Sequence, residues 1–318
     1  MLMLVPVSIS TWNVHVQAPG SFSILVYLLP FLTCGFRLNE DVLRRIVEHS
    51  DTETLLSWRL TSHTLFTLTA LTLRSRYLHL LTTFFGGQAL QFDNLLHRTG
   101  GILSGSLALL FMLWTESWEP GDLDVYISAP AYGDFIATFE STFPVVGSTR
   151  RLQRKEGKYD SSKILTIKQY TTQHGKKIDV IQSVDPNPAV PLTHFWTSLV
   201  VNFITPQGAV CAYPRSTLRR RGLVLDRPVP TRTVAARAKY EARGMSFEPV
   251  AHWIPRFLGT DNMLFADGNL LVLDFRPKPA MPPSELPIRR GLEGWHFRMP
   301  YPSDADCEFP FAVYLRSS

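Results

Sequence analysis

The stretch GSLALLFMLWTESWEPGDLDVY, residues 105–126, constrains the fold more than any other part of the chain. It opens with Gly105 and Ser106 before an apolar helical run and ends with Asp122 and Asp124 in a strand-like segment. Side chains alternate along a strand, so both carboxylates face the same way. Neighbouring carboxylates repel each other unless a cation lies between them. The spacing therefore indicates either a metal site or a solvent-facing acidic pair.

A third aspartate, Asp179, bears on the choice between a metal site and a solvent-facing acidic pair. Residues 164–170 and 177–182 alternate as two strands of a hairpin, with Asp179 in the middle of the second. An unpaired carboxylate inside an apolar strand is costly to bury, so Asp179 needs a partner. A metal ion shared with Asp122 and Asp124 would be that partner.

In their order along the chain, these residues resemble the signature of the DNA polymerase β-type nucleotidyltransferase superfamily. The matching positions are Gly105-Ser106 before a helix, Asp122-Leu123-Asp124-Val125 on a strand, and Asp179 on a later strand. The match covers about residues 100–185. The 15 residues of 107–121 between the two motifs are more than the family commonly has, and a loop at 118–121 accounts for the excess.

The resemblance implies an α+β fold with a small mixed sheet flanked by helices. It also implies Mg²⁺ or Mn²⁺ held by Asp122, Asp124 and Asp179, which would be both the metal ligands and the catalytic residues. Gly105 and Ser106 would bind the phosphates of a nucleoside triphosphate. Two-metal sites of this kind activate an attacking hydroxyl and stabilise the leaving pyrophosphate.

A basic stretch runs from Arg150 to Lys177, between the second and third carboxylates. A solvated loop and strand face would account for it without any function. In a nucleotide site it would contact the triphosphate or a polyanionic acceptor. Lys163 and Lys168 are the two residues expected to point at the cleft.

Residues 38–77 have the pattern of three helices, the last starting at Ser62 or His63 and running to Leu73. Part of the pattern resembles the F-box, a three-helix motif that docks adaptor proteins onto a cullin ubiquitin ligase. The matching residues are Leu38, Glu40, Val42, Leu43, Ile46, Leu55, Leu56, Arg59, Thr61 and Ser62. The resemblance implies an exposed apolar face around Leu38, Val42 and Leu43 that meets an F-box-binding adaptor. An ordinary three-helix subdomain packed on the next domain fits the same pattern.

Two later segments also carry helix signals. Arg219 to Arg221 followed by Gly222 is typical of a helix with a C-cap glycine, and 235–243 reads as a second helix closed by Gly244. Such helices would cover the nucleotide cleft from one side. The segment 194–204 is apolar and predicts a buried strand or helix. Asp267-Gly268 lies between apolar runs and predicts a hairpin.

Composition narrows the setting of the chain. A net charge of +5 is compatible with a phosphate-bearing partner without requiring one. The three cysteines, Cys34, Cys211 and Cys307, form no CxxC pair, which indicates a reducing compartment and an intracellular, cytoplasmic or nuclear location. The apolar segment 22–36 is shorter than the roughly 20 residues that span a bilayer, so it favours an N-terminal extension or a buried strand over a membrane partner.

The chain is thus expected to divide into an apolar extension (1–36), F-box-like helices (37–80), a nucleotidyltransferase-like domain (81–260) and a hairpin with a loop-rich tail (261–318). The leading hypothesis is metal-dependent transfer of a nucleotide to an acceptor. The alternatives are an F-box adaptor with a catalytically silent recognition domain and a structural protein in which the acidic residues serve a scaffold. The acceptor, whether protein, RNA or small molecule, stays open.

Overall fold

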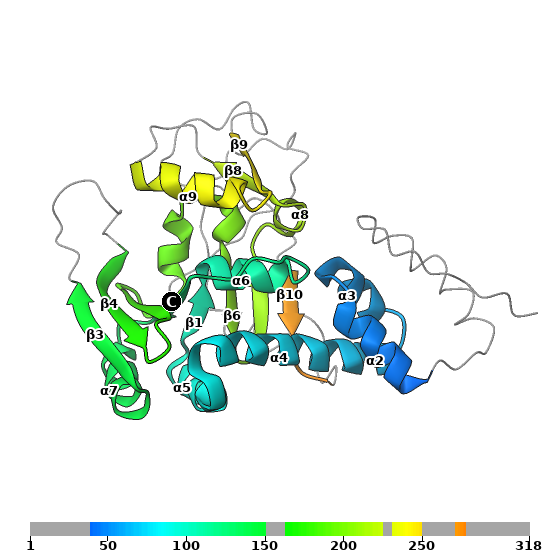
Figure 1. The fold of residues 1–318 in the computed structure, drawn as a ribbon, viewed down its shortest axis with the longest axis horizontal. Coiled ribbons are helices and arrows are strands. Elements are labelled where there is room, and N and C mark those ends of the chain that lie inside the picture. The colour runs from blue at the N-terminus through cyan, green and yellow to red at the C-terminus, as the bar shows by residue number, and fades with distance from the viewer. Residues whose placement is uncertain (1–38, 151–162, 225–230, 250–270, 278–318) are drawn as a thin grey trace, which may run out of the picture.

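The computed structural model describes residues 39–150, 163–224, 231–249 and 271–277. They form an eight-stranded mixed sheet flanked by helices and a separate two-stranded sheet (Figure 1). The predicted mixed sheet with flanking helices is therefore confirmed, although its eight strands make it larger than the small sheet expected. The large sheet has the strand order β10-β7-β6-β1-β2-β5-β4-β3, in which only β2 and β5 pair in parallel.

The strand bounds follow the alternating segments of the sequence. They are β1 Ile102–Ser104, β2 Asp122–Ile127, β3 Val145–Arg150, β4 Ile164–Thr172, β5 Lys177–Ser183, β6 Asn202–Thr205, β7 Gly208–Cys211, β8 Arg221–Val224, β9 Ser246–Pro249 and β10 Leu271–Asp274. Strands β4 and β5 form the predicted hairpin.

The helices begin at capping residues that the sequence already displays. Asn39, Asp51 and Ser62 each accept a hydrogen bond from a backbone N–H of the first turn that follows. The α-helices are α2 Glu40–His49, α3 Thr52–Arg59, α4 His63–Phe85, α5 Ala89–Thr99, α6 Gly105–Met112, α7 Tyr132–Thr142, α8 Pro214–Thr217 and α9 Thr231–Glu241, and the 3₁₀ helices are η1 Gly86–Gln88, η2 Val190–His194 and η3 Ser198–Val200. Among the described helices, none is both long and apolar enough to cross a membrane.

Side chains of strand β2 alternate between the two faces of the sheet. Leu123 and Val125 join the core formed with α4, α5, α6 and α7, whereas Tyr126 packs in a second core on the opposite face. Because side chains alternate along a strand, Asp122 and Asp124 lie on the same face as Tyr126. Figure 1 shows α9, β8 and β9 together above α6, with α4 below it in the same view.

Helices α2 to α4 share the core of the sheet. Leu55, Trp58 and Leu73 are buried in the same cluster as residues of α6 and β2. The Thr52 Oγ1 hydroxyl donates to the Met112 carbonyl at the end of α6, at 2.7 Å. Helix α4 runs to Phe85, past its predicted end at residue 73. It also crosses the domain boundary expected at residue 80, and the division into domains stays a prediction.

The predicted adaptor-docking face is engaged within the chain only in part. Leu43 and Ile46 of α2 pack against the core, while Val42 is 46% exposed. Leu38 lies outside the described residues. These contacts suit a packed three-helix subdomain, and they give the F-box interpretation no support.

An ion pair ties α4 and α5 to the β6–β7 turn, and its loss should destabilise the fold. Arg74 Nη1 donates to Asp93 Oδ1 at 3.0 Å and to the Pro206 carbonyl at 2.9 Å. Asp93→Ala would leave a partly buried guanidinium unpaired, so we expect the free energy of unfolding to fall by about 2–3 kcal/mol. Urea denaturation measures this change. Arg44→Ala, which removes the exposed pair with Glu40, should change it by less than about 0.5 kcal/mol, and equal effects would contradict the assignment.

Two sequence interpretations of the later chain are corrected. Gly222 does not end a helix: helix α8 already ends at Thr217, and Gly222 lies in β8, which pairs in parallel with β9. A side chain at Gly222 would collide with Phe247 across that pair, so close strand packing explains the glycine. Segment 194–204 is broken into the end of η2, η3 and the start of β6 rather than one element.

Helix α9 is confirmed, and Gly244 follows it with a left-handed φ of +79°. The hairpin predicted at Asp267-Gly268 lies outside the described residues, as do segments 1–38 and 278–318.

Candidate active site

A row of polar residues crosses the sheet where the three predicted aspartates meet. Strand pairing sets Ser104 opposite Asp124, Asp124 opposite Asp179, and Asp179 opposite Gln169. Paired residues of adjacent strands point to the same face. Asp122 lies two positions before Asp124 and shares that face, so one side of the sheet carries all three carboxylates.

The start of α6 is built against this row. Gly105 has a left-handed φ of +67°, and a Cβ on it would overlap the Asp124 Oδ2 atom and lie 3.1 Å from Asp124 Cγ. Glycine is therefore required both by the backbone angle and by the close approach of the carboxylate. The Ser106 hydroxyl donates a long hydrogen bond, 3.4 Å, to Asp122 Oδ1. The predicted Gly-Ser pair thus contacts two of the aspartates.

The third aspartate is oriented by its neighbour on β4. Gln169 Nε2 donates to both carboxylate oxygens of Asp179, at 3.1 and 3.3 Å. This amide holds the Asp179 side chain toward the β4 side of the row. The polar partner that Asp179 was expected to need is therefore the Gln169 side chain, which is present without a cation.

The electrostatic environment of Asp124 is dominated by burial and like charge. Desolvation raises the pKa of Asp124 well above its usual value, and the carboxylates of Asp122 and Asp179 raise it further. Lys239 on α9 acts in the opposite direction and lowers the pKa. Burial and the two neighbouring carboxylates therefore disfavour the ionised form of Asp124.

Helix α9 faces the aspartates, as expected of a helix covering the cleft. Burial raises the pKa of Tyr240, and the charges of Asp124 and Asp122 raise it further, while Arg243 lowers it. Desolvation lowers the pKa of Arg243, against smaller effects of Tyr240 and Asp122. These couplings place the last turn of α9 and the residues after it in the electric field of the aspartates.

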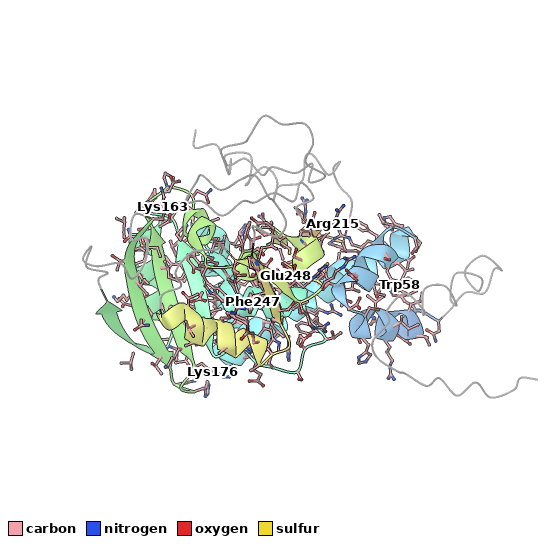
Figure 2. All side chains as sticks on the ribbon, turned by 90° about the horizontal axis from the view of Figure 1, so that it is seen from above. Trp58, Lys163, Lys176, Arg215, Phe247 and Glu248 are labelled. Carbon is pink, nitrogen blue, oxygen red and sulfur yellow. The ribbon has the colours of Figure 1, made fainter. Side chains whose placement is uncertain are left out.

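The two lysines predicted to line the cleft are not brought to it. Lys168 lies one position from Gln169 and so points to the opposite face, where Nζ pairs with Glu140 Oε1 of α7 at 2.6 Å. Lys163 precedes β4 next to Ser183, four positions along β5 from Asp179, or about 13 Å of strand. In Figure 2, Lys163 and Lys176 lie at opposite margins of the molecule.

Lys168 should consequently be dispensable for any chemistry at the aspartates. Lys168→Met removes a contact with Glu140 that lies on the helix-covered face, so we expect any activity that depends on the aspartates to stay within about twofold of wild type, below the tenfold change that corresponds to 1.4 kcal/mol. The initial rate of that activity measures this. A loss of tenfold or more would restore Lys168 to the site.

Several residues that the sequence interpretation passed over belong to this face. Gln169 and Lys177 lie on it through strand pairing, Lys177 opposite Asp122. The alternation of the hairpin was sufficient to find both. Lys239 lies in α9 and Arg243 follows that helix, far from the aspartates in sequence. In the sequence, only the positive charge of these two residues could have indicated a role at the site.

The donor set suits a divalent cation. Carboxylate oxygens are the ligands that Mg²⁺ and Mn²⁺ prefer, and a cation would favour the ionised form of Asp124. Within the described ranges, no group of three or more histidine, cysteine, aspartate or glutamate side chains is already arranged around a common point for a metal. Asp179, bound to Gln169, would join Asp122 and Asp124 as a ligand by a side-chain rotation.

Comparison with known proteins adds little to this geometry. No protein-family model matches the sequence, and no curated protein matches it. One solved structure, described as the CCA-adding enzyme in apo form I, is similar with a TM-score of 0.37 and 15% sequence identity. The matched region covers 55% of this chain and 43% of that enzyme. The function is therefore argued from the aspartates and their surroundings alone.

Proposed function

We propose that the chain is a metal-dependent nucleotidyltransferase that moves a nucleotide from a nucleoside triphosphate to an acceptor hydroxyl. One observation carries the proposal: three aspartates share a sheet face, with Asp122 and Asp124 at alternate positions of β2 and Asp179 paired with Asp124 across β5. The start of α6 lies against them, and Gly105 permits its close approach.

Each residue has a distinct role in this reaction. Asp122 and Asp124 would hold the divalent ions, and Asp179 would serve the ion beside the attacking hydroxyl. When bound, the ions supply charge stabilisation for an in-line displacement. Ser106, whose hydroxyl already reaches Asp122, would donate a hydrogen bond to a phosphate oxygen. The acceptor hydroxyl would release its proton to solvent as its oxygen forms a bond to the α-phosphorus, the bond from the α-phosphorus to the bridging oxygen would break, and pyrophosphate would leave.

Labelled nucleotides test the proposal directly. Wild-type protein is incubated in cell extract with Mg²⁺ or Mn²⁺ and each nucleoside triphosphate, labelled at the α- or the γ-phosphate. We expect an acceptor to gain the α-label and not the γ-label. The double variant Asp122→Asn/Asp124→Asn should lose the signal, and equal labelling by both proteins would rule out catalysis through this pair.

A further inference from the structure

Arg243, which follows α9, contacts the loop that precedes β2. The guanidinium of Arg243 lies over the Trp118 ring, 4.1 Å from its centroid. Arg243 Nη2 also donates to the Glu119 carbonyl at 3.3 Å. Both contacts fall within four residues of Asp122, so this loop holds Arg243 beside the aspartates rather than in open solvent.

This stacked pair has hydrogen-bond donors that are not used. Arg243 Nη1 and Trp118 Nε1 are both buried, and neither has a hydrogen-bond partner among the residues that the structure describes. Both atoms can only donate, and buried donors are seldom left unpaired. An acceptor that reached both groups would satisfy these donors, and the guanidinium charge favours an anionic one.

We propose that Trp118 and Arg243 form a subsite for a phosphate group of the nucleoside triphosphate, on the α9 side of the aspartates. The inference rests on the proposed function and adds the residues that bind the triphosphate. Lys239, in the last turn of α9, adds positive charge near Asp124, whose pKa it lowers. This subsite replaces the role predicted for Lys163 and Lys168.

The subsite should bind polyphosphate without a metal ion. Isothermal titration with inorganic tripolyphosphate in EDTA is the first measurement, and titration with ATP and Mg²⁺ is the second. Arg243→Met should weaken tripolyphosphate binding about 10–100-fold, the range that corresponds to a lost hydrogen bond to a charged group. Trp118→Phe keeps an aromatic ring under the guanidinium but removes the N–H, and we expect a loss of about threefold to tenfold.

The matched control is Arg237→Ala on the same helix. Arg237 is paired with Glu241 at 2.8 Å, and its guanidinium lies over the Phe247 ring, so its charge already has partners. It should bind tripolyphosphate as wild type does. Circular dichroism and melting temperatures of all three variants identify any variant that fails to fold, in which case Arg243→Lys replaces Arg243→Met, since it keeps the charge and loses the planar donors.

The outcomes separate this inference from the proposed function. Tripolyphosphate binding that depends on Arg243 supports the subsite even if no nucleotide is transferred to any acceptor. Nucleotide transfer and tripolyphosphate binding that are both unchanged in Arg243→Met and Trp118→Phe would overturn the subsite while leaving the aspartate chemistry intact. Equal weakening by Arg237→Ala would also overturn it, because the effect would then be one of general charge.

Discussion

Replacing Asp124 by asparagine should abolish nucleotide transfer and at the same time stabilise the metal-free protein. The carboxylate is expected to ligate the catalytic ions, so its loss should reduce the rate at least about 10³-fold. The same carboxylate is desolvated and lies near two others, which raise its pKa. Asparagine has a similar shape and no charge, so it removes that repulsion.

The gain in stability should depend on pH with a definite sign. Because the folded pKa of Asp124 lies above the unfolded value of 3.8, the folded protein binds the proton more tightly. Stability from this group is therefore present below pH 3.8 and is lost as pH rises toward the folded pKa. In urea denaturation with EDTA, the stability advantage of Asp124→Asn over wild type should be larger at pH 7.5 than near pH 4. An advantage that is absent or independent of pH would contradict the assigned environment.

Replacing Gly105 by alanine should be nearly as damaging. The left-handed φ of +67° disfavours any side chain, by about 1 kcal/mol, and the new Cβ would overlap the Asp124 carboxylate. We expect the variant to displace Asp124, to lose transfer activity about 100-fold or more, and to unfold at lower urea concentration.

Gly100 provides the matched control for this substitution. It has a similar φ of +62°, ends α5, and has no atom within 4 Å of a Cβ placed on it. Gly100→Ala therefore has the backbone strain without the collision and should keep its activity. If Gly105→Ala and Gly100→Ala lose activity and stability to the same extent, the contact between Gly105 and Asp124 has no functional role.

The parts of the fold that the sequence predicts are those set by local pattern. The alternation of β2 and the β4–β5 hairpin are legible in the chain, and they place Asp122 and Asp124 on one face of β2 and Asp179 within β5. The pairing of β2 with β5, which brings Asp179 beside Asp124, is not local; the superfamily resemblance implied a third acid on a neighbouring strand, and the parallel direction of the pairing comes from the structure.

The sequence-based predictions that the structure corrects depended on strand register or on contacts between residues far apart in the chain. Lys168 was assigned to the cleft although its neighbour Gln169 holds that position, and a change of one residue moves a side chain to the other face. Gly222 has the local signal of a helix cap, but its role depends on Phe247 on a strand that follows a separate helix. The approach of Arg243 to Trp118 likewise joins residues more than a hundred positions apart.

The central claim is that Asp122, Asp124 and Asp179 jointly hold divalent cations beside a nucleotide. Anomalous diffraction from crystals grown with Mn²⁺ and a non-hydrolysable nucleoside triphosphate tests it most directly. We predict Mn²⁺ peaks at the carboxylates of Asp122 and Asp124, with Asp179 turned away from Gln169 to join them and the triphosphate extending toward α9. Bound nucleotide with no Mn²⁺ at these carboxylates, or Asp179 still held by Gln169 in the complex, would contradict the claim.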